Sequence, residues 1–289
     1  MPGSLRRHLP LATLAALSLA ACATAPQTDA VADTAEATDP AYTPADAATR
    51  EAADRAPPLE RANFWATEHA KDPTDPDTTL KFGEALRAIG SNERVVEITT
   101  QTLVLHPKNS ALHLLKGRAH LALGQPEIAV NAFSRAASNN PMDATAYANL
   151  GLALDKVGQH RRAQTAYQRA LEIDPARSAT RSNFGLSLAL SGDLGAAEQQ
   201  LRHAVETPGA TSMVHQNLAL VLGLRGDFDA MAAAANDAPD EVVDRNVAVL
   251  KAFRGDVADL APAPSDTPAQ PEPEATGLRG AFSAPEDGA

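Results

Sequence analysis

Residues 151–158 read Gly-Leu-Ala-Leu-Asp-Lys-Val-Gly, and this octet sets the register of most of the chain. Octets at 83–90, 117–124 and 185–192 also begin and end with glycine, and successive octets start 34 residues apart. The octet at 219–226 keeps the final glycine and begins with alanine. A fixed period of this length indicates stacked structural repeats, in which each unit buries its apolar face on its neighbours.

Other positions follow the same period. A proline near the end of each unit would stop a helix, because proline lacks the amide hydrogen that helix continuation needs. A column of small residues faces a column of large ones, which lets two antiparallel helices approach to about 8–10 Å. The glycine that closes each octet can adopt the left-handed conformation that ends a helix. The columns are Pro73, Pro107, Pro141 and Pro175; Ala129, Ala163 and Ala197; and Phe133, Tyr167 and Leu201.

A period of 34 residues is that of the tetratricopeptide repeat, a helix–turn–helix unit. The sequence therefore predicts an all-α tetratricopeptide-repeat solenoid of about five helix pairs over residues 57–257, with a capping helix at each end. The expected pairs span roughly 76–106, 110–140, 144–174, 178–207 and 212–236, between a leading helix at about 58–71 and a trailing helix at about 241–254.

The first 22 residues predict export and lipidation. Arginines at positions 6 and 7 precede the apolar run 9–21, which is too short to span a bilayer but fits a secretory signal. The run ends in Leu19-Ala20-Ala21-Cys22, which resembles the lipobox of bacterial lipoproteins. We expect a signal peptide over residues 1–21 and a covalent lipid on Cys22, the only cysteine. The alternative is an ordinary signal peptide whose cysteine is incidental.

The flanks of the repeats are expected to be disordered. Residues 22–56 and 258–289 are rich in Ala, Pro, Thr and acidic residues, and such segments bury too little apolar surface to offset the entropy of ordering. We interpret the first as a tether and the second as an acidic tail. Ala23, directly after the cysteine, favours the outer membrane, with the protein lipid-anchored on its periplasmic side.

Composition argues against several function classes. The net charge of −11 disfavours nucleic acid, whose binding rests on neutralising phosphates. One cysteine rules out a disulfide within the chain and any multi-cysteine metal site. The sequence contains no Walker-type phosphate loop, nucleophile elbow or His-Glu-x-x-His motif. We therefore expect no enzyme activity, no small-molecule substrate, no metal, and no cofactor beyond the lipid on Cys22.

Two patterns invite sharper interpretations that we disfavour. His113 and His120 share a helical face and could bind a metal, but no third ligand is evident. With Lys116 they replace apolar residues of other repeats, so polar substitution at a loosely packed second repeat is the better interpretation. The Arg-Gly-Asp triplets at 225–227 and 254–256 suggest adhesion, yet each is better explained as a helix end with a glycine cap.

The first helix of each pair is expected to line the concave, partner-binding face. Asn149, Asn183 and Asn217 occupy one column there, which resembles the asparagine ladder of peptide-binding tetratricopeptide domains. An amide can donate and accept, so it can pair with peptide groups of any sequence; the alternative is that these amides are only solvated. The predicted groove also contains neighbours of the ladder, which are Arg118, Leu152, Leu186 and Arg181.

Several stretches resemble the TadD family, the tetratricopeptide lipoproteins of Flp (Tad, type IVc) pilus assembly. They are Asn63-Phe64-Trp65-Ala66, Gly185–Gly192, Gln216–Leu224 and Asn246–Leu250, within residues 58–255. The resemblance implies a pilotin-like adaptor that binds the outer-membrane secretin. Two alternatives stay open: a general periplasmic scaffold, for instance for peptidoglycan enzymes, and a peptide-binding chaperone not tied to pili.

Overall fold

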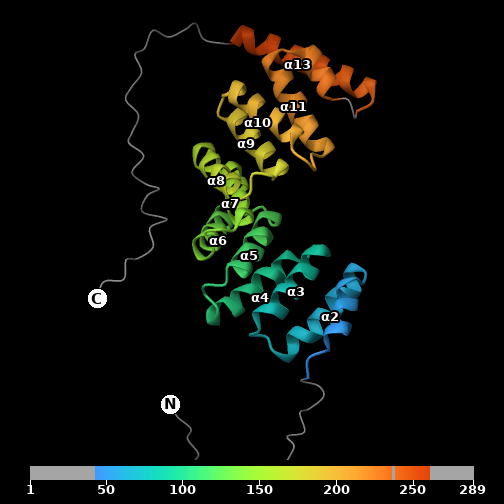
Figure 1. The fold of residues 1–289 in the computed structure, drawn as a ribbon, viewed down its shortest axis with the longest axis vertical. Helices are drawn as coiled ribbons and strands as arrows, with labels where there is room; N and C mark the ends of the chain where they lie inside the picture. Colours follow the sequence, from blue (N-terminus) through green and yellow to red (C-terminus); the bar gives the residue numbers. More distant parts are fainter. Residues whose placement is uncertain (1–42, 236–237, 261–289) are drawn as a thin grey trace, which may run out of the picture. The chain divides into compact units, whose positions relative to one another are not determined.

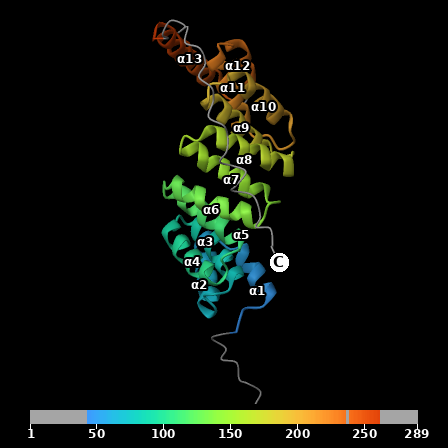
Figure 2. The same cartoon turned by 90° about the vertical axis from the view of Figure 1, so that its left-hand side faces the viewer.

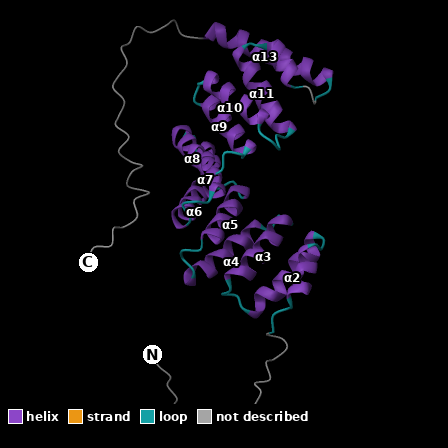
Figure 3. Cartoon of the chain, in the orientation of Figure 1, coloured by secondary structure: helices purple, strands orange, loops and turns teal. Residues whose placement is uncertain are grey.

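The computed structural model describes residues 43–235 and 238–260, and within them every regular element is an α-helix, joined to the next by a short loop (Figure 3). The helices are α1 (Ala47–Asp54), α2 (Pro58–Lys71), α3 (Pro76–Ala88), α4 (Asn92–Leu105), α5 (Ser110–Ala122), α6 (Pro126–Asn139), α7 (Ala144–Lys156), α8 (His160–Ile173), α9 (Ser178–Leu190), α10 (Leu194–Glu206), α11 (Ser212–Arg225), α12 (Phe228–Ala234) and α13 (Asp240–Leu260).

Helices α3 to α12 form five consecutive pairs. In each pair the first helix packs on the second, and the second packs on the first helix of the next pair (Figure 1). The predicted fold is confirmed, and the pairs begin and end within two residues of the expected positions. Helix α2 precedes the first pair, and α13 packs on α11 and α12 after the last one.

The two glycine columns of the octets have the predicted roles. A Cβ atom on Gly151 would lie 2.6 Å from the ring of Tyr167, so only glycine lets α7 approach α8 this closely. The closing glycine Gly158 has φ +75°, and the corresponding glycine of each other pair is left-handed as well. Helix starts are marked by acceptor side chains, for example Asp143, whose carboxylate accepts from two amides of α7.

A polar hub joins three helices in the middle of the stack. The carboxylate of Asp155 on α7 accepts hydrogen bonds from the Tyr167 hydroxyl of α8 (3.1 Å) and the Ser187 hydroxyl of α9 (2.7 Å). The ring of His160 also contacts it, at 2.9 Å. Burial raises the pKa of Tyr167, and the adjacent Asp155 carboxylate raises it further. Asp155 therefore links two consecutive repeats through one side chain.

The predicted boundaries of the flanking segments need correction. Helix α1 lies within residues 22–56, which we predicted to be a disordered tether, and Ala53 of this helix is buried. The trailing helix is longer than expected: α13 continues to Leu260, into the predicted tail. The polar contacts of α1 with α2 explain the first difference, because alternation of apolar residues gives no signal for a helix held in this way.

The second repeat differs from the prediction of loose packing. Helix α5 packs on α6 as closely as α7 packs on α8. His113 is buried and its Nε2 lies 2.8 Å from the carbonyl oxygen of Pro107, while Nδ1 of His120 lies 2.7 Å from the Gln125 side-chain oxygen. The two histidines thus contact different loops, and no group of three potential metal ligands occurs among the described residues.

The first Arg-Gly-Asp triplet is a helix junction. Gly226 is left-handed and ends α11, and the carboxylate of Asp227 caps α12 by accepting from the amide of Ala230 at 3.0 Å. The second triplet lies inside α13. Among residues 43–235 and 238–260, no helix is both long enough and apolar enough to cross a membrane.

Candidate protein-binding face

The first helices of neighbouring pairs touch one another directly. Helix α3 contacts α5, α5 contacts α7, α7 contacts α9, and α9 contacts α11, whereas the second helices in the described chain make no comparable contact with each other. The first helices therefore lie on the more tightly curved side of the stack (Figure 2). We call the surface formed by α3, α5, α7, α9 and α11 the first-helix face.

The three asparagines of the predicted ladder lie on this face, and all are half-buried. The amide of Asn149 donates to the Thr145 carbonyl (2.8 Å), and the amide of Asn217 donates to the Ser182 hydroxyl (2.9 Å). These internal bonds orient the two side chains and use one donor of each. Their carbonyl oxygens and second N–H groups can still pair with another chain.

Leucines follow the asparagines by three residues, about one helical turn. Leu152 and Leu186 are half-buried, as expected for a groove lining. The sequence prediction missed Leu220, which occupies the same column in α11 and is 43% exposed. It also missed Leu190 and Met213, which are 63% and 68% exposed. The 34-residue period could have revealed Leu220. The apolar part of the face thus extends over α9 and α11.

Arg181 has a different environment from the one predicted. Its guanidinium group donates to the Pro175 carbonyl (3.1 Å) and to the Gln200 side chain of α10 (3.4 Å). Burial lowers its pKa. This side chain therefore contacts the second helix of its own pair and the preceding loop, and we do not include it in the binding face.

Arg118 lies in the leucine column, on α5, and its neighbour Arg87 comes from α3. Burial lowers the pKa of Arg87, the positive charge of Arg118 lowers it further, and Glu84 raises it. Neither arginine forms an ion pair or side-chain hydrogen bond with the described residues, and Nε of Arg87 is buried without a partner. Sequence analysis missed Arg87, which falls outside the repeat consensus.

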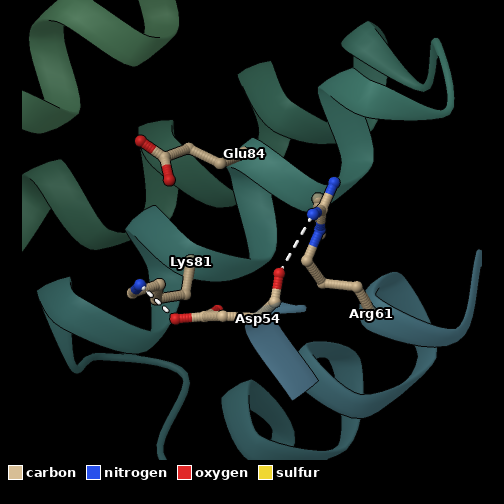
Figure 4. A pocket seen from close by; sticks show the side chains of 5 residues that line it. Asp54, Arg61, Lys81 and Glu84 are labelled. Carbon is tan, nitrogen blue, oxygen red and sulfur yellow. Dashed lines mark hydrogen bonds and ion pairs between the residues drawn. The ribbon is translucent and has the colours of Figure 1, made fainter. Parts of the chain in front are cut away.

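A cavity of about 320 Å³ lies at the start of the first-helix face, between α1, α2 and α3 (Figure 4). Asp54 lies between two basic residues: its carboxylate pairs with Lys81 at 2.6 Å, and its carbonyl accepts from Arg61 at 3.2 Å. Glu84 points away from this pair. Lys81 occupies, in the first repeat, the column of the asparagine ladder.

Polar contacts hold the segment 43–54 against α2. Glu68 is buried and pairs with Arg50 at 2.8 Å and with Lys71, and it accepts from the amide of Ala45. Burial raises the pKa of Glu68, but these donors outweigh burial and hold its pKa below the usual range. The indole of Trp65 donates to the carboxylate of Asp54 at 2.9 Å.

Some predicted features lie outside the described residues. They are the signal peptide over 1–21, lipidation at Cys22, the tether up to residue 42, and the tail from residue 261.

Comparisons with known proteins support the repeat assignment. Residues 114–156 and 144–176 each match a tetratricopeptide-repeat family. A search of curated proteins finds no match. Two solved structures resemble the fold. MamA from residue 41 to its end, from Desulfovibrio magneticus RS-1, is 24% identical over 55% of this chain and 90% of its own, with a TM-score of 0.51. YrrB is 20% identical over 63% of this chain and 96% of its own, also with a TM-score of 0.51.

YrrB is described as a tetratricopeptide-repeat protein with an unusual peptide-binding site, which is a statement about that protein. Tetratricopeptide-repeat proteins are typically non-catalytic scaffolds that bind other proteins. The helix pairs, their 34-residue period and the family matches agree. The described chain is a tetratricopeptide-repeat α-solenoid, the architecture of a protein-interaction scaffold.

Proposed function

We propose that this protein is a lipid-anchored adaptor, attached through Cys22 to the periplasmic side of the outer membrane, that binds an extended polypeptide segment along its first-helix face. The observation that supports the binding role is the combination of oriented amides and exposed leucines on that face. The amides can pair with the backbone of any segment, and the leucines select for apolar side chains.

The proposed partner is the secretin of an Flp (Tad) pilus system. The supporting observations are the sequence resemblance to the TadD family and the lipobox-like stretch that ends at Cys22. In this role the repeats hold a secretin segment while the lipid keeps the pair at the membrane. Two or three acyl chains make such attachment lasting, whereas one chain binds only marginally.

Deletion of the gene tests the pilus role. Secretin multimers and surface pili are compared between the parent strain, the deletion strain and a strain complemented with the native chain. We expect multimers and pili to be lost on deletion and restored by complementation. Normal multimers in the deletion strain would contradict the adaptor role in secretin assembly.

The triple variant Asn149→Ala, Asn183→Ala, Asn217→Ala tests the binding face in the same assay. We expect it to be expressed and helical but to restore multimers poorly, because the amides are half-buried surface groups and not core residues. A matched control replaces asparagines away from this face, Asn131 and Asn139 of α6, by alanine. Full complementation by the triple variant would rule out the asparagine column as the grip.

A further inference from the structure

Two unpaired arginines of consecutive first helices lie close together at the charged end of the binding face. Arg87 comes from the last turn of α3, and Arg118 from the middle of α5. They are near enough for the charge of Arg118 to lower the pKa of Arg87, after the larger effect of burial. Like charges in this arrangement repel one another, so an anion between them would be stabilised twice.

The missing counter-charge is unusual for this molecule. Most of its other half-buried charged groups have partners, as Glu68 does with Arg50 and Lys71. Nε of Arg87 is buried and makes no hydrogen bond with the described residues. Glu84 lies on α3 and raises the pKa of Arg87, but it forms no ion pair with either arginine. An unsatisfied, partly desolvated guanidinium group carries a free-energy cost that an incoming carboxylate would offset.

The apolar part of the face begins one repeat further along. Arg118 is followed in the same column by Leu152, Leu186 and Leu220, each on the next first helix. Neighbouring packed helices lie about 8–10 Å apart, and an extended chain advances about 3.3 Å per residue. A bound segment therefore needs about three residues to pass from one of these side chains to the next.

We propose that Arg87 and Arg118 form a carboxylate-binding subsite, which takes an acidic side chain of the bound segment and fixes its register so that apolar side chains at three-residue spacing reach Leu152, Leu186 and Leu220. This proposal rests on the proposed binding function and specifies its partner. The partner motif is an acidic residue followed, or preceded, by large apolar residues every third position.

Fluorescence anisotropy with defined peptides tests the subsite on the full-length protein in detergent. The probe is a labelled peptide Glu-Ser-Ala-Leu-Ser-Ala-Leu-Ser-Ala-Leu, used together with its reversed sequence because the direction of the chain is open. In the comparison peptides, glutamine replaces the glutamate. We expect one of the two directions to bind about tenfold more tightly with glutamate than with glutamine, as a charge-assisted hydrogen bond would give.

Protein variants supply effects of opposite sign. Arg118→Gln is expected to remove the preference for glutamate, and Arg87→Gln to reduce it, without lowering the melting temperature. Glu84→Gln is expected to tighten binding of the glutamate peptide, because it removes a competing negative charge; loss of folding cannot produce this gain. Arg245→Gln, a matched charge change on the exposed surface of α13, is expected to leave the affinity unchanged.

Three outcomes would overturn the proposal. The first is equal affinity for the glutamate and glutamine peptides, which leaves a binding face without a carboxylate subsite. The second is no binding of any of these peptides. The third is displacement of the glutamate peptide by inorganic phosphate at equal concentration, which would show a general anion site. None of these results decides the pilus role, which depends on secretin multimers in the deletion strain.

Discussion

Single residues set how closely the helices of a pair approach. Gly151 illustrates this, because its missing side chain is what allows the ring of Tyr167 to lie against α7. The same column in the other pairs meets Phe133 or Leu201 at similarly short distances. The sequence predicted this role without a structure, since small and large residues alternate in one register. The contacts of Asp155 had no such signal, because hydrogen bonds between repeats depend on rotamers.

Gly151→Ala is expected to destabilise the protein by about 1–3 kcal/mol, since the added Cβ would lie 2.6 Å from the Tyr167 ring and force the helices apart. Urea unfolding followed by circular dichroism measures the change. Gly195→Ala is the matched control: its Cβ would meet nothing closer than 3.8 Å, and alanine favours a helix over glycine. Equal stability of the two variants would show that α7 and α8 can separate at little cost.

Asp155→Ala is expected to lower the free energy of unfolding by about 2–4 kcal/mol, because two buried hydroxyl groups on two helices lose their acceptor. The loss should be visible in the urea midpoint. Asp193→Ala removes an exposed carboxylate that only caps α10, so its cost should be smaller, near 1 kcal/mol. If the two variants lost similar stability, the hub would contribute no more than an ordinary cap.

At the scale of elements, buried histidines connect helix packing with pH. Burial lowers the pKa of His69, where the ring lies 3.3 Å from the Thr79 hydroxyl, and burial also lowers the pKa of His113. The unfolded chain therefore binds protons more readily than the folded one below about pH 6.5. Stability contributed by the neutral rings is complete above that pH and is lost as the pH falls toward the lowered values.

We expect the urea midpoint to decrease between pH 7.5 and pH 5, and the decrease to be smaller in the double variant His69→Gln, His113→Gln. Nearby charges modify the effect at His69: Arg94 lowers the pKa, and Asp72 and Asp75 raise it. An identical pH dependence in the native protein and the double variant would attribute the loss to other groups.

Helix α1 is attached mainly by charge, which makes its docking sensitive to single substitutions. Glu68→Gln is expected to weaken the contacts with Arg50, Lys71 and Ala45, and so to release α1 from α2. Trp65 is the only tryptophan and is 2% exposed beneath this helix, so its emission should shift to longer wavelength. Glu51→Gln breaks an exposed pair with Arg55 and should leave the emission unchanged. An unshifted spectrum for Glu68→Gln would show that other contacts hold α1.

At the scale of the whole molecule, the sequence predicted the architecture far better than the chemistry of the face. The period gave five helix pairs and both capping helices, because repeated packing constraints leave repeated residues. It identified Arg118, Leu152, Leu186 and the asparagine column as surface positions. It could not predict that Arg181 contacts α10, that Arg87 lacks a partner, or that α1 covers Trp65, because these depend on side-chain conformation in three dimensions.

Attachment to the membrane is also a property of the whole molecule, and it stays a prediction. Cys22→Ser removes the thiol that would receive the lipid. We expect this variant to appear in the soluble periplasmic fraction instead of the outer-membrane fraction, with the repeats still folded by circular dichroism. Ala23→Ser, next to the lipidation position, is the control. Retention of Cys22→Ser in the membrane fraction would contradict lipid anchoring.

The docking of α1 has a mechanical consequence. Tension that arrives along the chain from its N-terminal side reaches Thr43 and α1 before any helix pair, and it meets Lys71 and Glu68 as the first resisting contacts. These bonds are few and near the surface, whereas the pairs behind them are held by extensive apolar packing. A pull would therefore lengthen the chain by peeling off α1 while the binding face keeps its shape, so that this helix acts as a shock absorber for the load.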